Sequence, residues 1–189
     1  MVKTAKFATM LALGLLLCLI AACSPAQDKP FYTRVSDAKL KAGDTIPAPT
    51  GDVILTVTGK IGTTNKDKSI VMDRAMIESV GQVEYKVTDP FENKPFVYRG
   101  VLVSDLLGLW KVADDAKSLR FTALDDYQRN VALAEIHKYP VLFALQRDGQ
   151  DLPATLAPAM LVYPYDNFTF DQKIYNNYWA WQIKTIEVQ

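Results

Sequence analysis

The most informative stretch for the architecture of this chain is FVYRGVLVSDLL, residues 96–107. Its first four residues are aromatic, β-branched or long, a composition typical of a β-strand. Ser104 belongs to the residue types that cap helices, and a helix over residues 105–110 would place Leu106 and Leu107 on one apolar side. The stretch therefore predicts a strand followed at once by a short helix that faces the core.

Outward from this stretch, the chain contains many short segments with the composition or the alternation of strands. They are residues 53–59, 83–88, 119–124, 128–133, 141–146, 160–163 and 179–188. Asp73 can cap a short helix through Val80, residues 134–138 form a helical turn, and Asp148-Gly149 predicts a hairpin. Many short strands with a few short helices indicate an α+β fold, β-rich and mixed, in a single domain.

The N-terminus has the features of a lipoprotein signal peptide. Lys3 and Lys6 precede an apolar run over residues 7–20, which ends in Ala-Ala-Cys at Cys23. The run is short for a transmembrane helix, which needs about 20 apolar residues. We expect residues 1–22 to be removed and Cys23 to be lipidated. The alternative is an uncleaved anchor helix in which the cysteine is incidental.

This interpretation predicts a periplasmic protein that is held on a lipid membrane by acylated Cys23. Each buried CH₂ of the acyl chains adds about 0.8 kcal/mol, so anchoring by several chains is effectively permanent. Ser24 after the cysteine favours the outer membrane over the inner one. Residues 23–50 are expected to form the lipid anchor and an extended tether, and residues 51–189 the folded domain.

Composition excludes several classes of function. The chain has 21 basic and 21 acidic residues, and it loses Lys3 and Lys6 with the signal, so the domain is slightly acidic. No basic stretch is interleaved with aromatic residues, which excludes typical nucleic-acid binding. Once residues 1–22 are removed, Cys23 is the only cysteine. A single histidine, His137, excludes a multi-histidine metal site, and we expect it on the surface. No Gly-x-Ser-x-Gly nucleophile motif is present.

Aromatic residues are concentrated near the C-terminus. Strand alternation over residues 179–188 would place Trp179 and Trp181 on one face. Aromatic walls with a few polar groups suit a flat heteroaromatic ligand, but the same residues could equally pack a core. The aromatic residues in this stretch are Tyr163, Tyr165, Phe168, Phe170, Tyr175, Tyr178, Trp179 and Trp181, and the interleaved polar residues are Asp166, Asn167, Asn176, Asn177 and Gln182.

The order of several segments resembles the sulfite-oxidase-type molybdopterin-binding domain family. The similarity begins near residue 52 and continues to residue 189. It is carried by FVYRGVLVSDLL (96–107), TALDDY (122–127), YPVLFA (139–144) with Asp148-Gly149, Ala157-Pro158, LVYP (161–164) and WQIKTIEV (181–188). The resemblance implies the β-rich mixed fold of that family.

Two departures from the family pattern bear on function. Catalytic members hold molybdenum through a protein cysteine, whereas the corresponding residues 87–91 are VTDPF. These side chains cannot replace a soft thiolate ligand. Related small proteins also carry an arginine and a tryptophan around a Gly-Pro pair, and both are missing from ATLAPAM, residues 154–160. The chain resembles a small exported branch that has this domain alone, and some members of that branch bind reduced pterins and report them to a membrane signalling enzyme.

The resemblance implies a non-enzymatic lipoprotein with a pterin-like ligand and a membrane sensor as its partner. Because the molybdenum-ligating cysteine is missing, we expect no catalytic cofactor and no metal. Phe91 and Trp181 would stack on the ligand, and Asp126 would accept hydrogen bonds from an amino-pyrimidine edge. The remaining predicted lining residues are Thr88, Tyr127 and Tyr165. Two alternatives stay open: a molybdopterin-dependent oxidoreductase, and a protein-interaction module without a small ligand.

Overall fold

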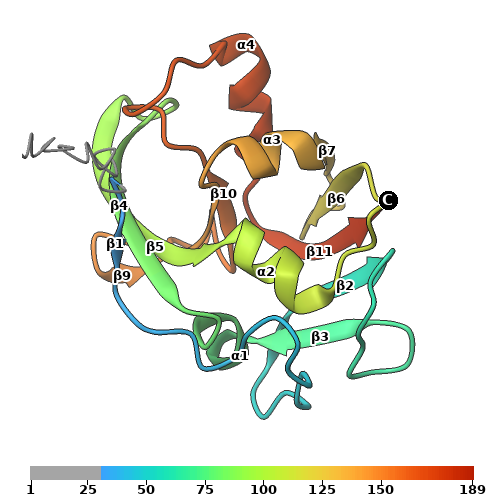
Figure 1. Ribbon diagram of the computed structural model, residues 1–189. Coiled ribbons are helices and arrows are strands. Elements are labelled where there is room, and N and C mark those ends of the chain that lie inside the picture. The colour runs from blue at the N-terminus through green and yellow to red at the C-terminus, as the bar shows by residue number, and fades with distance from the viewer. Residues whose placement is uncertain (1–30) are drawn as a thin grey trace, which may run out of the picture.

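The computed structural model describes residues 31–189, which form two β-sheets with short helices around them (Figure 1). A six-stranded sheet has the order β1-β4-β5-β8-β10, with β9 paired to β8, and a five-stranded sheet has the order β3-β2-β11-β6-β7. The strands are β1 (Thr33–Arg34), β2 (Val53–Gly59), β3 (Ile70–Asp73), β4 (Gln82–Asp89), β5 (Lys94–Leu102), β6 (Ser118–Ala123), β7 (Gln128–Ala132), β8 (Leu142–Arg147), β9 (Gln150–Asp151), β10 (Met160–Val162) and β11 (Ile183–Val188). The helices are α1 (Arg74–Glu78), α2 (Val103–Trp110), α3 (Leu133–Lys138), α4 (Gln172–Tyr175) and the 3₁₀ turn η1 (Asn176–Tyr178).

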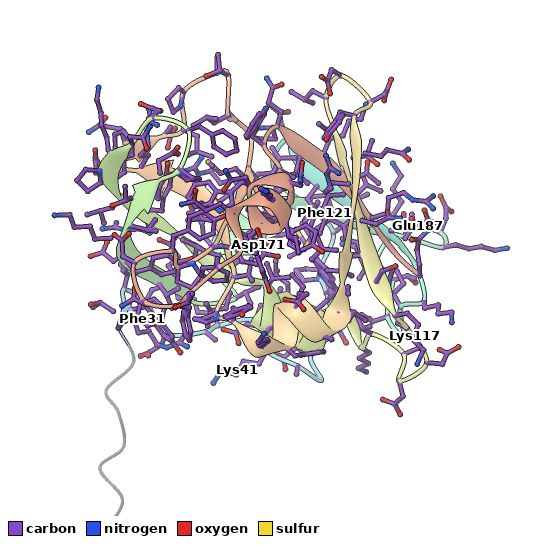
Figure 2. All side chains as sticks on the ribbon, turned by 90° about the horizontal axis from the view of Figure 1, so that it is seen from above. Phe31, Lys41, Lys117, Phe121, Asp171 and Glu187 are labelled. Atoms are coloured by element: carbon purple, nitrogen blue, oxygen red, sulfur yellow. The ribbon has the colours of Figure 1, made fainter. Side chains whose placement is uncertain are left out.

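This architecture confirms the predicted β-rich α+β class. Strand β4 buries Val83, Tyr85 and Val87 on alternate positions, as its sequence pattern predicts. Strand β11 lies between β2, to which it is parallel, and β6, to which it is antiparallel. The C-terminal residues therefore complete a sheet that begins early in the chain. Figure 2 shows Phe31 near the edge of the molecule and Phe121 among the side chains of the interior, where it is 1% exposed.

Of the two predicted helix caps, the one at Asp73 is confirmed and the one at Ser104 is wrong. Asp73 caps α1, because its carboxylate accepts a hydrogen bond from the Met76 amide at 2.8 Å. Ser104, in contrast, does not cap α2. That helix begins at Val103, without a side-chain cap. The physical reason is that β5 continues directly into the helix, and the Val103 amide donates to the Val141 carbonyl at 3.0 Å instead.

The last strand is shorter than its composition predicts. Residues 179–182 are not part of β11, which begins at Ile183. Gln182 has a φ of 53°, in the left-handed region, and this breaks the extended conformation. Trp179 and Trp181 consequently do not share a strand face: Trp179 is 2% exposed and Trp181 is 39% exposed.

Residues 31–50 are packed on the domain, which corrects the expectation of a tether over this part of the chain. Strand β1 pairs with β4, and the amides of Lys39 and Leu40 donate to the Ser79 carbonyl. Leu40 and Ile46 are buried in the core. The predicted cleavage at Cys23 and the segment up to residue 30 lie outside the described residues. Within residues 31–189, no helix has the length and apolarity needed to span a membrane.

Asp73 stabilises two segments at once and gives a pH-dependent prediction. Besides the Met76 amide, its carboxylate accepts from the amides of Thr50 and Gly51 at 2.8 and 2.9 Å. The Met76 bond, aided by those from Gly51 and Thr50, lowers the pKa of Asp73 against the opposing effect of burial. We expect Asp73→Ala to lower the free energy of unfolding by about 2 kcal/mol at neutral pH.

Because the folded-state pKa of Asp73 is depressed, its contribution is complete above the unfolded-state pKa of about 3.9 and disappears as the pH falls through the folded-state value. Urea unfolding of the wild type and the variant at about pH 7 and about pH 2 measures the difference. The two proteins should converge in acid. An equal difference at both pH values would contradict this account.

Candidate ligand-binding site

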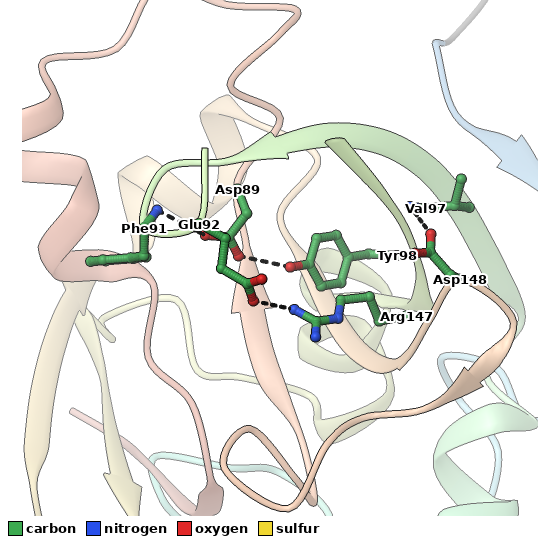
Figure 3. A network of polar contacts seen from close by, with 7 residues as sticks. All are labelled: Asp89, Phe91, Glu92, Val97, Tyr98, Arg147 and Asp148. Atoms are coloured by element: carbon green, nitrogen blue, oxygen red, sulfur yellow. Dashed lines mark hydrogen bonds and ion pairs between the residues drawn. The ribbon is translucent and has the colours of Figure 1, made fainter. Parts of the chain in front are cut away.

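The loop that joins β4 to β5 is held by a buried carboxylate (Figure 3). Asp89 is 4% exposed. One of its oxygens accepts from the amides of Phe91 and Glu92 at 2.8 and 3.0 Å, and the other accepts from the Tyr98 hydroxyl at 2.8 Å. Burial, and then the hydrogen bond to Asp89, raises the pKa of Tyr98, so this phenol stays protonated and donates. The loop conformation therefore depends on a bond network inside the domain.

A second set of contacts fixes the outer side of the same loop. Arg147 of β8 pairs with Glu92 at 2.5 Å, and its guanidinium lies 4.2 Å from the ring centroid of Phe96. Asp148, in the β8–β9 turn, accepts from the Val97 amide at 2.8 Å. Figure 3 shows Phe91 at the opposite end of this network, pointing away from it. The network thus sets the position of an aromatic side chain that is itself largely exposed.

Phe91 forms an aromatic group with two tryptophans from the other end of the chain. Its ring lies perpendicular to that of Trp181, with centroids 5.2 Å apart, and 6.4 Å from that of Trp179. Phe91 is 49% exposed and Trp181 is 39% exposed. Large aromatic side chains that are only half-buried offer apolar surface to a ligand.

These rings border a hollow of about 320 Å³. A volume of this size lies at the lower end of the range for small-molecule sites. The hollow is formed by the β4–β5 loop, the β6–β7 hairpin, η1 and the segment before β11. Its lining residues are Phe91, Ala123, Asp125, Tyr127, Arg129, Asn176, Asn177, Trp179, Ala180, Trp181 and Gln182.

The polar side chains of the hollow keep both donors and acceptors available. Asn176 accepts from the Tyr165 hydroxyl through its oxygen, which leaves its amide N–H groups. Gln182 donates to the Ala154 carbonyl, which leaves its oxygen. Asp125 accepts from the Tyr127 amide through only one of its two oxygens. A ligand with a mixed donor and acceptor edge therefore finds complementary groups here.

The structure brings together three of the six predicted site residues. Phe91, Tyr127 and Trp181 line the hollow. Thr88 and Tyr165 line a separate depression beside it, where Asp166 accepts from the backbone amide and the hydroxyl of Thr88. Tyr165 still bears on the main hollow, because its hydroxyl donates to Asn176 at 2.8 Å.

Asp126 is not among the residues that line the hollow. It adopts a φ of 66° at the tip of the β6–β7 turn, and its carboxylate pairs with Lys184 at 2.8 Å. Its side chain is 83% exposed. The preceding residue, Asp125, is the carboxylate that lines the hollow. The left-handed conformation at Asp126 turns the side chains of Asp125 and Asp126 to different sides of the turn. Only Asp125 therefore lines the hollow.

Neither Arg129 nor Asp125 was among the site residues predicted from the sequence. A usable signal existed for Arg129, since it shares a face of β7 with the buried Val131, two residues on. The C-terminal aromatic residues satisfy both of the predicted roles. Tyr163 and Tyr175 are buried core residues, Trp181 borders the hollow, and Trp179 is both buried and part of the lining of the hollow.

Histidine and cysteine, two common metal-binding residue types, are scarce among the described residues. His137 is exposed, as predicted. Residues 31–189 contain no cysteine, and within them no group of three or more His, Cys, Asp or Glu side chains is arranged to hold a metal ion.

Comparison with known proteins agrees with the fold and the motifs. Residues 90–165 match the family described as the oxidoreductase molybdopterin binding domain. The sulfane dehydrogenase SoxCD from Paracoccus pantotrophus has a similar structure, with a TM-score of 0.53 and 16% sequence identity. The similarity covers 71% of this chain and 37% of that chain. No curated protein matches the sequence. The family match over residues 90–165 and the similar fold support the resemblance to the sulfite-oxidase-type molybdopterin-binding domain that the motifs predict.

Proposed function

We propose that this protein binds a pterin-like heteroaromatic molecule in the hollow between Phe91, Tyr127 and Trp181, and that it does so without molybdenum catalysis. The observation that carries the proposal is the hollow itself, which combines half-exposed aromatic rings with unsatisfied polar groups. A flat bicyclic ring can stack on Phe91 and Trp181 while its edges meet Asp125, Asn176 and Gln182. Such a division between apolar faces and polar edges is general for small-molecule sites.

The chain's own donor set supports binding without molybdenum. Thr88 lies in the segment where catalytic family members carry their cysteine, and both its amide and its hydroxyl are hydrogen-bonded to Asp166. Without a cysteine in residues 31–189, no soft thiolate is available to the metal. The residues present therefore do not fit a molybdenum centre of the family's usual type.

The rest of the proposed role rests on the N-terminal sequence and the resemblance. Lipid on Cys23 would hold the domain on the periplasmic side of a membrane, with the outer membrane favoured by Ser24. A membrane sensor would then read whether the ligand is bound. The exposed rim of the hollow, formed by Phe91, Tyr127 and Trp181, is the surface that a bound ligand would alter most.

Calorimetric titration with tetrahydropterin tests the proposal. The protein should first be purified under denaturing conditions and refolded, so that any endogenous ligand is removed. We expect Trp181→Ala to weaken binding about thirtyfold, since stacking of a base on an aromatic side chain contributes roughly 1–3 kcal/mol.

Phe168→Ala is a matched control for this titration, because Phe168 is also 39% exposed but does not line the hollow. It should leave the affinity unchanged. Absence of binding by the wild type at submillimolar ligand would overturn the proposal.

A molybdopterin-dependent oxidoreductase is the second candidate, and the family match over residues 90–165 favours it. It predicts stoichiometric molybdenum in protein isolated from its native compartment. Elemental analysis of that preparation separates the two candidates, because the binding proposal predicts no molybdenum.

A further inference from the structure

Arg129 is set apart from the other arginines of residues 31–189 by its lack of a carboxylate partner. Each of the others lies within ion-pair distance of an Asp or Glu: Arg34, Arg74, Arg99, Arg120 and Arg147. Arg129 forms no ion pair within this part of the chain, and its Nε is buried without a hydrogen-bond partner. Its guanidinium lies 5.1 Å from the ring centroid of Tyr127. An unpaired cation therefore lines the hollow.

A second unsatisfied donor lines the same hollow. Trp179 is 2% exposed, and its indole Nε1 has no hydrogen-bond partner among the described residues. Buried donors are nearly always paired in folded proteins, and an unpaired one costs about 1–3 kcal/mol. Because Arg129 and Trp179 both line the hollow, a ligand there is in a position to supply the acceptors that these donors lack within residues 31–189.

The chemistry of these donors defines the acceptor. A guanidinium and an indole N–H both donate and cannot accept, so their partner must supply lone pairs. A planar guanidinium binds oxyanions more strongly than it binds neutral acceptors. Asp125 lines the same hollow and could take the opposite end of a ligand, because one of its oxygens has no hydrogen-bond partner within residues 31–189.

We propose that the ligand of this hollow carries an oxyanion, such as a carboxylate or a phosphate, which binds Arg129 and the indole N–H of Trp179. This inference rests on the proposed heteroaromatic ligand and narrows its class. The ring stacks against Phe91 and Trp181, its donor edge meets Asp125, and its anionic substituent neutralises Arg129. Arg129 is then the residue that determines specificity for charged over neutral heterocycles.

A matched pair of probes tests the inference, namely pterin-6-carboxylate and 6-methylpterin, which differ in the charge of one small substituent. Titration of the refolded full chain in detergent should give at least about tenfold tighter binding of the carboxylate, as expected for a charge-assisted hydrogen bond. Arg129→Gln should abolish this preference while 6-methylpterin still binds. Arg120→Gln, on the neighbouring strand and outside the hollow, should preserve it.

The outcomes separate this inference from the proposed function. Equal affinity of the wild type for both pterins overturns the oxyanion and leaves heteroaromatic binding intact. If Arg129→Gln weakens the affinity for both pterins by the same factor, the oxyanion is also overturned. The arginine would then act only by packing on Tyr127. Binding of neither probe by the wild type overturns both proposals.

If Arg129→Gln does not fold, Trp179→Phe serves in its place, because it keeps a buried aromatic ring and removes the N–H together with the pyrrole part of the indole. The preference for the carboxylate should then fall about threefold. An unchanged preference in this variant would overturn the role of the indole.

Discussion

Replacing Gly100 with alanine is expected to lower the free energy of unfolding by about 3–5 kcal/mol, a large share of the 5–15 kcal/mol typical of a domain. A Cβ at this position would lie 2.0 Å from the Phe143 carbonyl oxygen and 2.7 Å from the Ala144 Cα. Both are backbone atoms of β8, so neither can rotate away. Strands β5 and β8 would have to separate at the centre of the six-stranded sheet, where Gly100 pairs with Ala144.

Gly108→Ala is the matched control, because it makes the same substitution eight residues later. A Cβ at Gly108 would meet only the Ala42 side chain, at 3.5 Å, which is an ordinary contact. Since alanine is the better helix former by about 1 kcal/mol, this variant should be as stable as the wild type or more so. Urea denaturation of both variants measures the difference. Similar midpoints for the two would show that the sheet can relax around Gly100.

Asp89→Ala is expected to lower the free energy of unfolding by about 3–4 kcal/mol, because it leaves three donors in the domain without their acceptor. These donors are the amides of Phe91 and Glu92 and the hydroxyl of Tyr98. Loss of the amide bonds also frees the loop that carries Phe91. Affinity for a stacked ligand should therefore fall, even at a temperature where the variant is folded.

Two further substitutions separate these effects. Tyr98→Phe removes one of the three bonds and should cost about 1 kcal/mol, with the loop and the ligand affinity preserved. Asp126→Asn removes an exposed ion pair to Lys184 and should change stability by less than about 1 kcal/mol. The measurements are urea denaturation and pterin titration of each variant. Wild-type affinity in Asp89→Ala would show that Phe91 is positioned by other contacts.

The elements of this fold could be predicted well where the pattern is local. The alternation in β4, the hairpin of β8 and β9 and the cap at Asp73 each depend on residues close together in the chain. Errors occurred where a distant segment intervened. The Val141 carbonyl replaced Ser104 as the partner of the first helical turn, and the left-handed Gln182 shortened the last strand.

The aromatic lining of the hollow was partly predictable, and its polar lining was less so. Phe91 and Trp181 were predicted from the family resemblance and from the concentration of aromatic residues near the C-terminus. Tyr165 differs, because it acts on the hollow only through its hydrogen bond to Asn176. No sequence pattern could predict that bond, because it depends on how the loop after β10 folds back over the domain.

The amino-acid sequence alone was sufficient to define the β-rich fold, its family motifs and the lack of a cysteine after Cys23, since these depend on residue identity and local periodicity. Tertiary structure decided which groups meet in the hollow. It placed Asp125 rather than Asp126 in the lining and left Arg129 without a carboxylate partner among residues 31–189. The physical reason is that the hollow joins segments far apart in the chain, whose side-chain directions are set by single left-handed residues and by packing between the segments.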